Sequence, residues 1–535
     1  MAKFLRNKAI SFVPSLHHEH THYKWWVLIS VMIGTFMAVL DSTIVNVGLS
    51  KMTAAFGTSV DKIEWVLTSY LLIFAVMLPS SGWVADHLGY KKTYFAGMLL
   101  FTIGSLLCSL SWDENALIFS RVIQGAGAGF VMPVGMAIVT REFPPEQRGT
   151  ALGFWGIASA ASVSLGPLIG GYLIDTFSWH AIFDVNIPVG IAGLIAILII
   201  QREFKTEKAR DFDFIGFISM SVFLTSLLLA LADGNASWNT GGWSSPFILS
   251  CFFISAISFI VFIVTEINIK HPIVDLTLFK DRNFASANLI LFVFGIGFFG
   301  STFLLPLYLQ DSLGYTAFQA GLVFLPLGII QAIVSPIAGR LTDKINPKFL
   351  VMTGIVLLAW SLYAYGFFSL QTENAQIQIP LLVRALALGM IFIPLSAVSL
   401  LSIPKYKIAQ ASGLFNTVRQ VGGSFGVALL GSMLTRRTIF HMQTFSQTVD
   451  SNSPAFQNTV IHLKNHVMQS VGGSPAEITS RAKALIMLNL SSQSFIQGIN
   501  DDFLVAALLT IILVIPVLFL KITRAKSLNK IEVIE

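Results

Sequence analysis

The sequence predicts an all-α, polytopic membrane protein with fourteen transmembrane helices. Of its 535 residues, 54% are hydrophobic and only 12% are charged, whereas soluble globular proteins carry about 25% charged residues. The apolar residues gather in runs of the length that a helix needs to cross a bilayer. Basic residues collect in alternate segments between these runs. The composition therefore excludes a soluble enzyme, a disordered chain and a fibrous protein.

Each expected helix corresponds to one apolar run. The first run is too long for the core of a signal peptide, and no small-residue cleavage pattern follows it, so we expect it to remain in the mature protein. Cys108 and Cys251 both lie inside runs, which does not indicate a disulfide framework. The runs lie at residues 25–49, 65–85, 93–111, 116–139, 151–174, 181–200, 214–233, 246–266, 287–309, 320–341, 349–369, 380–403, 411–434 and 503–522.

The positions of Lys and Arg predict that both termini lie in the cytoplasm. With that orientation the inner segments hold 24 basic residues and the outer segments hold 7, of which 5 lie in one long segment, 435–502. Cytoplasmic loops of membrane proteins carry such an excess of basic residues. The net charge of +6 is therefore a topology signal, and it gives no support to nucleic-acid binding.

An internal repeat relates the first six spans to the last six. Corresponding short motifs recur at nearly constant separations of 257, 260 and 263 residues. Self-similarity of this kind indicates duplication, although glycine and aspartate also recur by chance at helix ends. The matched segments are Gly82–Asp86 with Gly339–Asp343, Ala151–Trp155 with Ala411–Phe415, Gly166 with Gly426, and Arg121 with Arg384.

The repeat predicts two six-helix halves that share one orientation, with the seventh and eighth spans as an inserted pair. Parallel repeats of this kind suit a transporter that rocks around a site between its halves. We expect a cytoplasmic arm at 1–24, a first half at 25–200, cytoplasmic linkers with the inserted pair at 201–286, a second half at 287–522 that includes an outer loop at 435–502, and a cytoplasmic tail at 523–535.

Several motifs, in order along the chain, resemble signatures of the major facilitator superfamily. The inner loop after the second span contains Gly82, Asp86, Gly89, Lys91 and Lys92 and resembles the signature between helices 2 and 3. The segment Arg121–Gly129 resembles the fourth-helix signature. The fifth span carries Gly166, Pro167, Gly170 and Gly171, which resemble the signature associated with antiporters.

Three further segments resemble one branch of that superfamily, the fourteen-helix drug:proton antiporters of the EmrB/QacA-like type. They are Leu40–Val47, Trp179–Gly190 and Asn416–Gly423. The resemblance covers residues 25–522. It implies the major facilitator fold, multidrug efflux coupled to protons, a role in antibiotic resistance, and a bacterial cell (inner) membrane location.

Two positions depart from the family pattern. Asp184 stands near the outer end of the sixth span, where an apolar residue is expected. The second copy of the inner loop, 339–348, is degenerate, because it has Asn346 and Pro347 where the first copy has Gly89 and Tyr90.

Asp41 is the main candidate for proton coupling. It is the one acid well inside an expected span, and Gly34 and Ala38 share its helix face. Acids inside membranes are costly and usually functional. Arg121 lies at a similar depth, and its effect on the carboxyl would change as the halves move. A static ion pair of Asp41 with Arg121 is the alternative.

Other cations and glycines within the spans have less specific interpretations. Arg384 is the repeat counterpart of Arg121, with a role in substrate binding or in structure; Arg419 fits a structural role better than a substrate contact. Pro167 interrupts hydrogen bonding in its helix, and the small residues beside it permit close helix contact, which fits either a packing kink or a hinge.

Two polar segments outside the spans carry weaker signals. The histidines between His17 and His22 fit a solvated arm better than a metal site, since nothing fixes ligand geometry. In 435–502, Phe456, Val460, Leu463 and Val467 recur at helical spacing, and Ser474–Glu477 forms a capping box. We expect two short amphipathic helices there, on the outer surface, against the membrane or a partner.

The leading interpretation is a secondary transporter that exports amphipathic or cationic small molecules in exchange for protons. A proton-coupled importer, or an exporter of one specific metabolite, on the same fold is the alternative. A membrane-embedded enzyme is disfavoured, because the spans lack clustered catalytic groups and no phosphate-binding loop is present. We expect no cofactor and no metal. The resemblance permits a periplasmic adaptor and an outer-membrane channel as partners.

Overall fold

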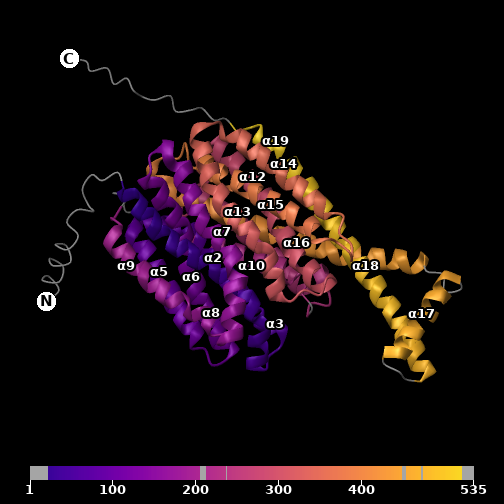
Figure 1. The fold of residues 1–535 in the computed structure, drawn as a ribbon. Coiled ribbons are helices and arrows are strands. Elements are labelled where there is room, and N and C mark those ends of the chain that lie inside the picture. Colours follow the sequence, from indigo (N-terminus) through magenta and orange to yellow (C-terminus); the bar gives the residue numbers. More distant parts are fainter. Residues whose placement is uncertain are drawn as a thin grey trace, which may run out of the picture.

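The computed structural model describes residues 22–204, 212–236, 238–270, 272–448, 454–470 and 474–520. Within these residues the chain forms helices and contains no strand. Most helices lie side by side in one bundle, and a helical arm projects from it (Figure 1). The expected arm at 1–24, with His17 and His20, lies almost wholly outside the described residues, as does the expected tail at 523–535.

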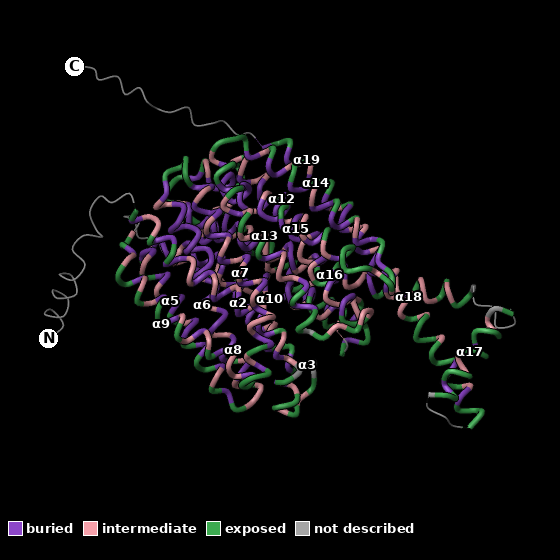
Figure 2. Tube along the Cα trace, in the orientation of Figure 1, coloured by how far each residue is buried: buried purple, intermediate pink, exposed green. Residues whose placement is uncertain are grey.

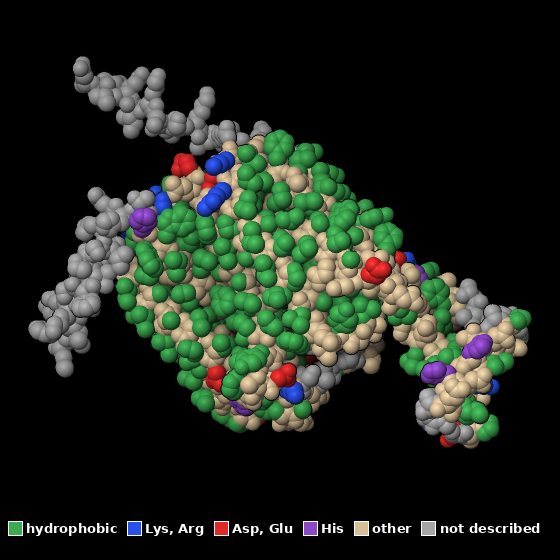
Figure 3. Space-filling view, viewed as in Figure 1, with side chains coloured by type: hydrophobic (Ala, Val, Ile, Leu, Met, Phe, Trp, Pro, Cys, Tyr) green, Lys and Arg blue, Asp and Glu red, His purple; other side chains and the backbone are tan. Residues whose placement is uncertain are grey.

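Buried residues concentrate in the middle of the bundle, and exposed ones dominate the projecting arm (Figure 2). On the face in Figure 3, hydrophobic side chains cover the middle of the bundle, and charged side chains gather towards its two ends. Among the described residues, thirteen helical segments are long and apolar enough to cross a membrane. The predicted all-α, multi-pass membrane fold is confirmed.

The first half of the chain begins and ends its helices with recognisable signals. Gly57 ends the first helix in a left-handed conformation (φ 61°), and the Asp113 side chain accepts a hydrogen bond from the amide of Ala116 at the start of α6. The helices are α2 (Tyr23–Phe56), α3 (Val60–Ile63), α4 (Trp65–Leu88), α5 (Tyr90–Ser109), α6 (Glu114–Glu142), α7 (Arg148–Thr176), α8 (Ala181–Asp184) and α9 (Asn186–Ile200).

Several of the remaining helices are likewise capped. Asp213, Ser245, Asp281 and Thr316 each accept a hydrogen bond from the first turn of the helix that follows. The helices are α10 (Phe214–Asp233), α11 (Pro246–Asn268), α12 (Arg282–Leu307), α13 (Ala317–Lys344), α14 (Pro347–Tyr365), α15 (Asn374–Ser399), α16 (Ile408–Thr448), α17 (Pro454–Ser470), α18 (Pro475–Ile512) and α19 (Val514–Val517).

The two groups of helices meet along α7 with α13 and α4 with α16, and α10 of the inserted pair packs against both α4 and α16. Small residues bring the backbones together. A Cβ atom on Gly153 of α7 would lie 2.5 Å from the Ser335 carbonyl of α13, and one on Gly82 of α4 would lie 2.6 Å from the Gln410 backbone of α16. Glycine is therefore needed at both crossings.

The prediction of an outer loop at 435–502 is wrong, because the described residues of this segment are almost entirely helical. α16 runs on to Thr448, and α18 begins at Pro475 and continues without a break into the last membrane segment. The capping box of Ser474 with Glu477 and the helix through Val460 and Val467 are confirmed. The second amphipathic helix is not short, because no glycine or proline interrupts the chain between Pro475 and Gly498.

The expected span at 411–434 lies inside α16 but is not among the thirteen apolar segments. Asn416, Arg419 and Gln420 lower its apolar character, as do several glycines. α16 packs mainly against four other helices, α12, α18, α4 and α6. Because other helices and not lipid surround much of α16, it tolerates polar residues that a lipid-facing helix excludes.

Candidate functional site

Asp41 lies on α2 and is completely buried, with a side-chain exposure of 0%. Three donors reach its carboxylate from two other helices. Arg121 Nη1 of α6 lies 2.5 Å from Oδ2, Gln124 Nε2 of α6 lies 2.8 Å from Oδ1, and Asn186 Nδ2 of α9 lies 3.2 Å from Oδ1. The carboxylate is thus held by one charged and two neutral donors.

Arg121 is also completely buried, and it is held in place from several directions. Its Nε donates to the Val66 carbonyl at 3.0 Å, its Nη1 donates to Gln124 Oε1 at 2.5 Å, and its guanidinium lies 4.1 Å from the ring centre of Tyr70. Residues 121 and 124 share one face of α6, since they are separated by three positions. The geometry fixes the guanidinium opposite Asp41.

The network extends beyond the pair. Gln124 Nε2 also donates to Ser105 Oγ of α5 at 2.8 Å, and the Tyr70 hydroxyl donates to the Ala38 carbonyl at 3.2 Å. One nitrogen of Arg121, Nη2, has no hydrogen-bond partner among the described residues. Ser105 and Tyr70 are uncharged and belong to none of the motifs described above, so the sequence alone gave no reason to select them.

A buried ion pair is stable only while both of its groups are charged. Taking two ions out of water is costly, and removal of one partner leaves an uncompensated buried charge at a cost of about 3–5 kcal/mol. Proton binding to Asp41 has the same electrostatic effect as removing the carboxylate charge. The network is therefore chemically suited to couple a proton to a rearrangement of α2, α6 and α9.

Arg384 of α15, the repeat counterpart of Arg121, has no carboxylate partner among the described residues. Its Nη2 donates to the Phe298 carbonyl at 3.0 Å and to Thr302 Oγ1, both on α12. The side chain is 1% exposed, and Nε and Nη1 have no hydrogen-bond partner there. Arg384 thus brings a buried positive charge without local compensation.

Arg419 lies on α16 close to aromatic side chains. Its guanidinium lies 5.2 Å from the ring centre of Phe392 on α15, and its Nε has no hydrogen-bond partner among the described residues. The Phe392 ring in turn stacks on Trp155 of α7, with ring centres 6.4 Å apart. Arg419 therefore sits beside an aromatic contact between the two groups of helices.

The inner-loop motif forms a tight junction between α4 and α5. Gly89 adopts φ 104°, a conformation that favours glycine, and Tyr90 donates to Asp86 Oδ1 at 3.0 Å. The amides of Lys91 and Lys92 donate to the two carboxylate oxygens of Glu203 at 3.1 and 3.3 Å. Glu203 therefore caps α5, a role that its distance in sequence concealed.

The second copy of that loop departs from the first in sequence but makes a contact between the two halves. Asp343, at the end of α13, accepts hydrogen bonds from the amides of Gly149 and Thr150 at 2.9 and 2.8 Å and from the Thr150 hydroxyl at 2.6 Å. A carboxylate of the second half thereby caps α7 of the first half. Asn346 and Pro347 start α14, with Asn346 as its cap, so the departure from the Gly89-Tyr90 pattern is a helix start.

The antiporter-like motif packs α7 against two helices. A Cβ on Gly166 would lie 2.1 Å from Thr43 Oγ1 of α2, and one on Gly170 would lie 2.7 Å from Ile44. Pro167 faces Gly321 of α13, and Gly171 faces Phe318 of the same helix. α7 passes through Pro167 without a break. The motif therefore places α7 between α2, which carries Asp41, and α13.

Two further acids, Asp184 and Asp502, lie in surroundings that the sequence did not indicate. Asp184 ends α8, and the chain passes through Val185 into α9; the Ser109 hydroxyl donates to the Asp184 carboxylate at 2.5 Å. Asp502 of α18 is 0% exposed, and neither of its oxygens has a hydrogen-bond partner among the described residues. It directly precedes the expected span 503–522, beside Asp501, which pairs with Arg437.

Comparisons with known proteins agree with this architecture. A model of the Major Facilitator Superfamily matches residues 31–427. The multidrug export protein EmrB of Escherichia coli (strain K12) is 32% identical over 498 residues, which cover 92% of this chain and 94% of that protein. The uncharacterised MFS-type transporter YhcA of Bacillus subtilis (strain 168) is 30% identical over 94% of each chain.

One other relative and one solved structure complete the comparison. The fatty acid resistance protein FarB of Neisseria gonorrhoeae is 30% identical and covers 92% of this chain and 95% of its own length. The crystal structure of the human organic anion transporter MFSD10 (TETRAN) superposes with a TM-score of 0.59 at 14% identity, over 91% of this chain and 99% of that one. At that identity the likeness is one of fold alone.

Proposed function

The chain belongs to the Major Facilitator Superfamily, and from this premise we propose that it exports amphipathic or cationic small molecules in exchange for protons. Export is the activity named for the EmrB relative, which matches this chain over most of both lengths. The single structural observation that carries the coupling proposal is the buried ion pair of Asp41 with Arg121.

Coupling requires a group whose affinity for protons differs between two conformations. In this conformation Asp41 is enclosed and fully paired, so a proton can reach it only when α2, α6 and α9 move apart. We propose that the structure represents the deprotonated state. Protonation then releases Arg121 from Asp41 and favours the opposite conformation.

The closed end of the bundle supplies the second part of the mechanism. Asp343 caps α7 across the two halves, and Gly82 lets α4 touch the backbone of α16. Both contacts lie at the end of the bundle that carries the inner loops. We propose that this end faces the cytoplasm, with both termini on that side of a bacterial cell membrane, and that breaking these contacts opens an inward-facing cavity.

Efflux of a fluorescent cationic dye from energised bacterial cells that express the protein tests the function. The proposal predicts active dye export that stops when a protonophore collapses the proton gradient. Proton-dependent dye uptake would identify an importer, which is the runner-up function. Efflux that continues at the same rate after the gradient collapses, while ATP is present, would rule out proton coupling.

A periplasmic adaptor and an outer-membrane channel remain predicted partners. The projecting arm formed by the ends of α16 and α18 with α17 (Figure 1) supports a contact beyond the membrane. Dye export in proteoliposomes that contain this chain alone tests that prediction. Full activity there would mean that transport across its own membrane needs no partner.

A further inference from the structure

A cleft of about 850 Å³ lies where the inserted helix pair meets α16 and α18. It is separate from the Asp41 network, and the transport proposal makes no use of it. Its walls come from α10, the turn before α11, α11 itself, α16 and α18. Most of the side chains that line them are apolar, among them Phe252, Phe425, Leu429 and Val505.

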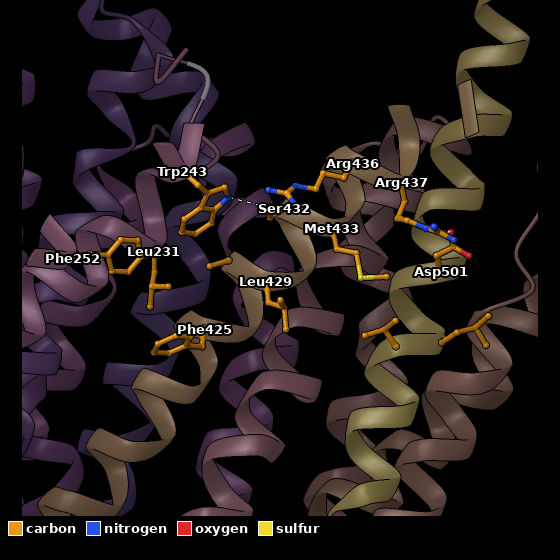
Figure 4. A pocket seen from close by; sticks show the side chains of 13 residues that line it. Leu231, Trp243, Phe252, Phe425, Leu429, Ser432, Met433, Arg436, Arg437 and Asp501 are labelled. Carbon is orange, nitrogen blue, oxygen red and sulfur yellow. Dashed lines mark hydrogen bonds and ion pairs between the residues drawn. The ribbon is translucent and has the colours of Figure 1, made fainter. Parts of the chain in front are cut away.

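Polar and apolar side chains occupy different parts of the cleft (Figure 4). The labelled polar side chains Arg436, Arg437 and Asp501 lie along one edge of the cleft, and among them Arg436 points towards the Trp243 indole; Leu429 and Phe425 lie towards the opposite edge of the view. A molecule that fills the cleft therefore meets charge at one end and hydrocarbon along the rest. That division matches an amphiphile with one polar head.

Hydrogen bonds tie the turn between α10 and α11, on one side of the cleft, to α16 on the other side. Trp243 Nε1 donates to Ser432 Oγ of α16 at 3.0 Å and to Asn235 Oδ1 at 2.9 Å. Asn235 Nδ2 donates to the Ala428 carbonyl of α16 at 3.3 Å. The turn between α10 and α11 is thus tied to α16, which fixes the position of the indole at the rim of the cleft.

The charges at the polar end do not cancel. Asp501 lies 2.6 Å from Arg437 Nε and 2.7 Å from His441 Nε2. Arg436 has no acidic side chain within ion-pair distance in the described part of the chain, and it is exposed. Arg437 engages Asp501, and the adjacent Asp502 is fully buried and does not line the cleft. Arg436 is therefore the exposed, unpaired cation that an anion in the cleft meets.

The depth of this charge matches the polar surface of a bilayer. Arg436 follows the apolar stretch of α16 that ends near residue 434, and Trp243 lies in the short turn between two membrane helices. Arginine and tryptophan side chains favour the headgroup level of a membrane. Leu429 precedes Arg436 by about two helical turns, which places it deeper in the membrane. Its side chain is 47% exposed, so the cleft opens sideways towards the lipid.

We propose that this cleft binds one anionic phospholipid of the surrounding bilayer. The phosphate lies against Arg436 near the Trp243 indole, and an acyl chain lies along Phe252, Phe425 and Val505. Such a lipid fills the gap between the inserted pair and the second half of the bundle. The proposal concerns a site at the periphery, so it stands or falls independently of the transport function.

Quenching of Trp243 by brominated lipids in nanodiscs tests the proposal. Phosphatidylglycerol and phosphatidylcholine, each brominated on an acyl chain, are compared at equal mole fraction. Subtracting the signal of Trp243→Phe isolates this tryptophan from the other nine. We expect a preference of about fivefold for the anionic lipid, the effect of one basic residue at a membrane surface. Retained lipid, counted by mass spectrometry after detergent exchange, gives a readout that does not use the Trp243→Phe variant.

Three variants separate the lipid site from general electrostatics. Arg436→Gln removes the preference, Arg436→Lys keeps most of it, and Lys483→Gln, which removes an exposed cation of α18 outside the cleft, leaves it unchanged. Equal quenching by both lipids in the wild-type protein would overturn the proposal, as would an equal loss in Lys483→Gln. Displacement of the lipid by soluble glycerol phosphate would show that the cleft binds free phosphate and is not a lipid site.

Discussion

Both halves of the bundle bury an arginine at corresponding positions of the repeat, but their partners differ. Arg121 of the first half faces the carboxylate of Asp41 and is surrounded by amide and aromatic groups. Arg384 of the second half faces Thr302 and a backbone carbonyl of α12. Thr302 lies 261 residues after Asp41, within the range of separations that relates the other repeated motifs.

The difference shows how a duplicated scaffold acquires unequal electrostatics. A buried carboxylate with a buried guanidinium can exchange a proton and change its net charge, whereas a threonine with a guanidinium cannot in the physiological pH range. At this pair of positions, only the first half has a carboxylate that can take up a proton, which is why we propose it as the coupling element. The second half holds a fixed positive charge at a similar place in its own fold.

The largest expected effect comes from removing the partner of each arginine. Asp41→Asn leaves the Arg121 charge uncompensated and should lower the free energy of unfolding by about 3–5 kcal/mol. Thr302→Val removes one hydrogen bond from Arg384 and should cost about 1 kcal/mol. Denaturant unfolding in detergent measures both. Equal losses would mean that the two halves do not differ energetically, and Asp41→Asn with Arg121→Gln should recover most of the larger loss.

Supplying the missing acid sharpens the comparison. Thr302→Asp places a carboxylate opposite Arg384, which already contacts residue 302. A charge-assisted hydrogen bond contributes about 1.5–3 kcal/mol, so Thr302→Asp should be more stable than Thr302→Asn by about that amount. The same unfolding measurement compares them. If the aspartate is the less stable variant, Arg384 is already compensated by other groups.

The contacts between the halves should produce a smaller effect. Asp343→Asn weakens the cap on α7, at a cost of about 1 kcal/mol, which shifts the balance between the closed and open forms of that end about fivefold. Spin labels at the exposed positions Glu146 and Arg340 measure the distribution of distances between the two halves at this end of the bundle. Asp175→Asn, at the opposite end of α7, is the control. An unchanged distribution in Asp343→Asn would remove this carboxylate from the gate.

The smallest effect is expected at an ion pair outside the membrane. Burial alone would raise the pKa of Asp275, but the hydrogen bonds from Lys407 and Thr277 outweigh it and hold the pKa below its ordinary value. A lowered folded-state pKa adds stability above the unfolded value of about 3.9, and this stability is lost as the pH falls below that value. Asp275→Asn should therefore cost less than about 1 kcal/mol at neutral pH and nothing at the acid end. A difference independent of pH would contradict this account.

The sequence predicted most of the membrane fold because the bilayer restricts it strongly. Lipid admits few polar residues in a spanning helix, so the apolar runs predicted most of the helices. Residues 435–502 escaped this reasoning. Outside the membrane a helix needs no apolar run, and α16 and α18 extend beyond it with polar sequences that resemble a loop in composition.

The site was predictable only where a residue is unusual for its surroundings. Asp41 and Arg121 are charged residues within apolar runs, so their types alone marked them. Gln124 and Asn186 belonged to motifs but had no assigned contact. Asp343 was given no contact, because its partner, the start of α7, lies almost two hundred positions away in the sequence. Asp502 directly precedes the expected span 503–522, so the apolar pattern gave no reason to select it.

Proton release on addition of substrate tests the central claim most directly. Wild-type protein is reconstituted in vesicles with a pH-sensitive dye in the lumen, and a cationic dye substrate is added. Asp41→Asn is compared with the double variant Asp41→Asn with Arg121→Gln, which removes both charges and preserves the fold. The account predicts substrate-dependent proton movement in the wild type, altered pH dependence in Asp41→Glu and none in either neutral variant. Proton exchange at the wild-type rate in the folded double variant would contradict it, and Asp502 and Asp184 would then be the carboxylates to test.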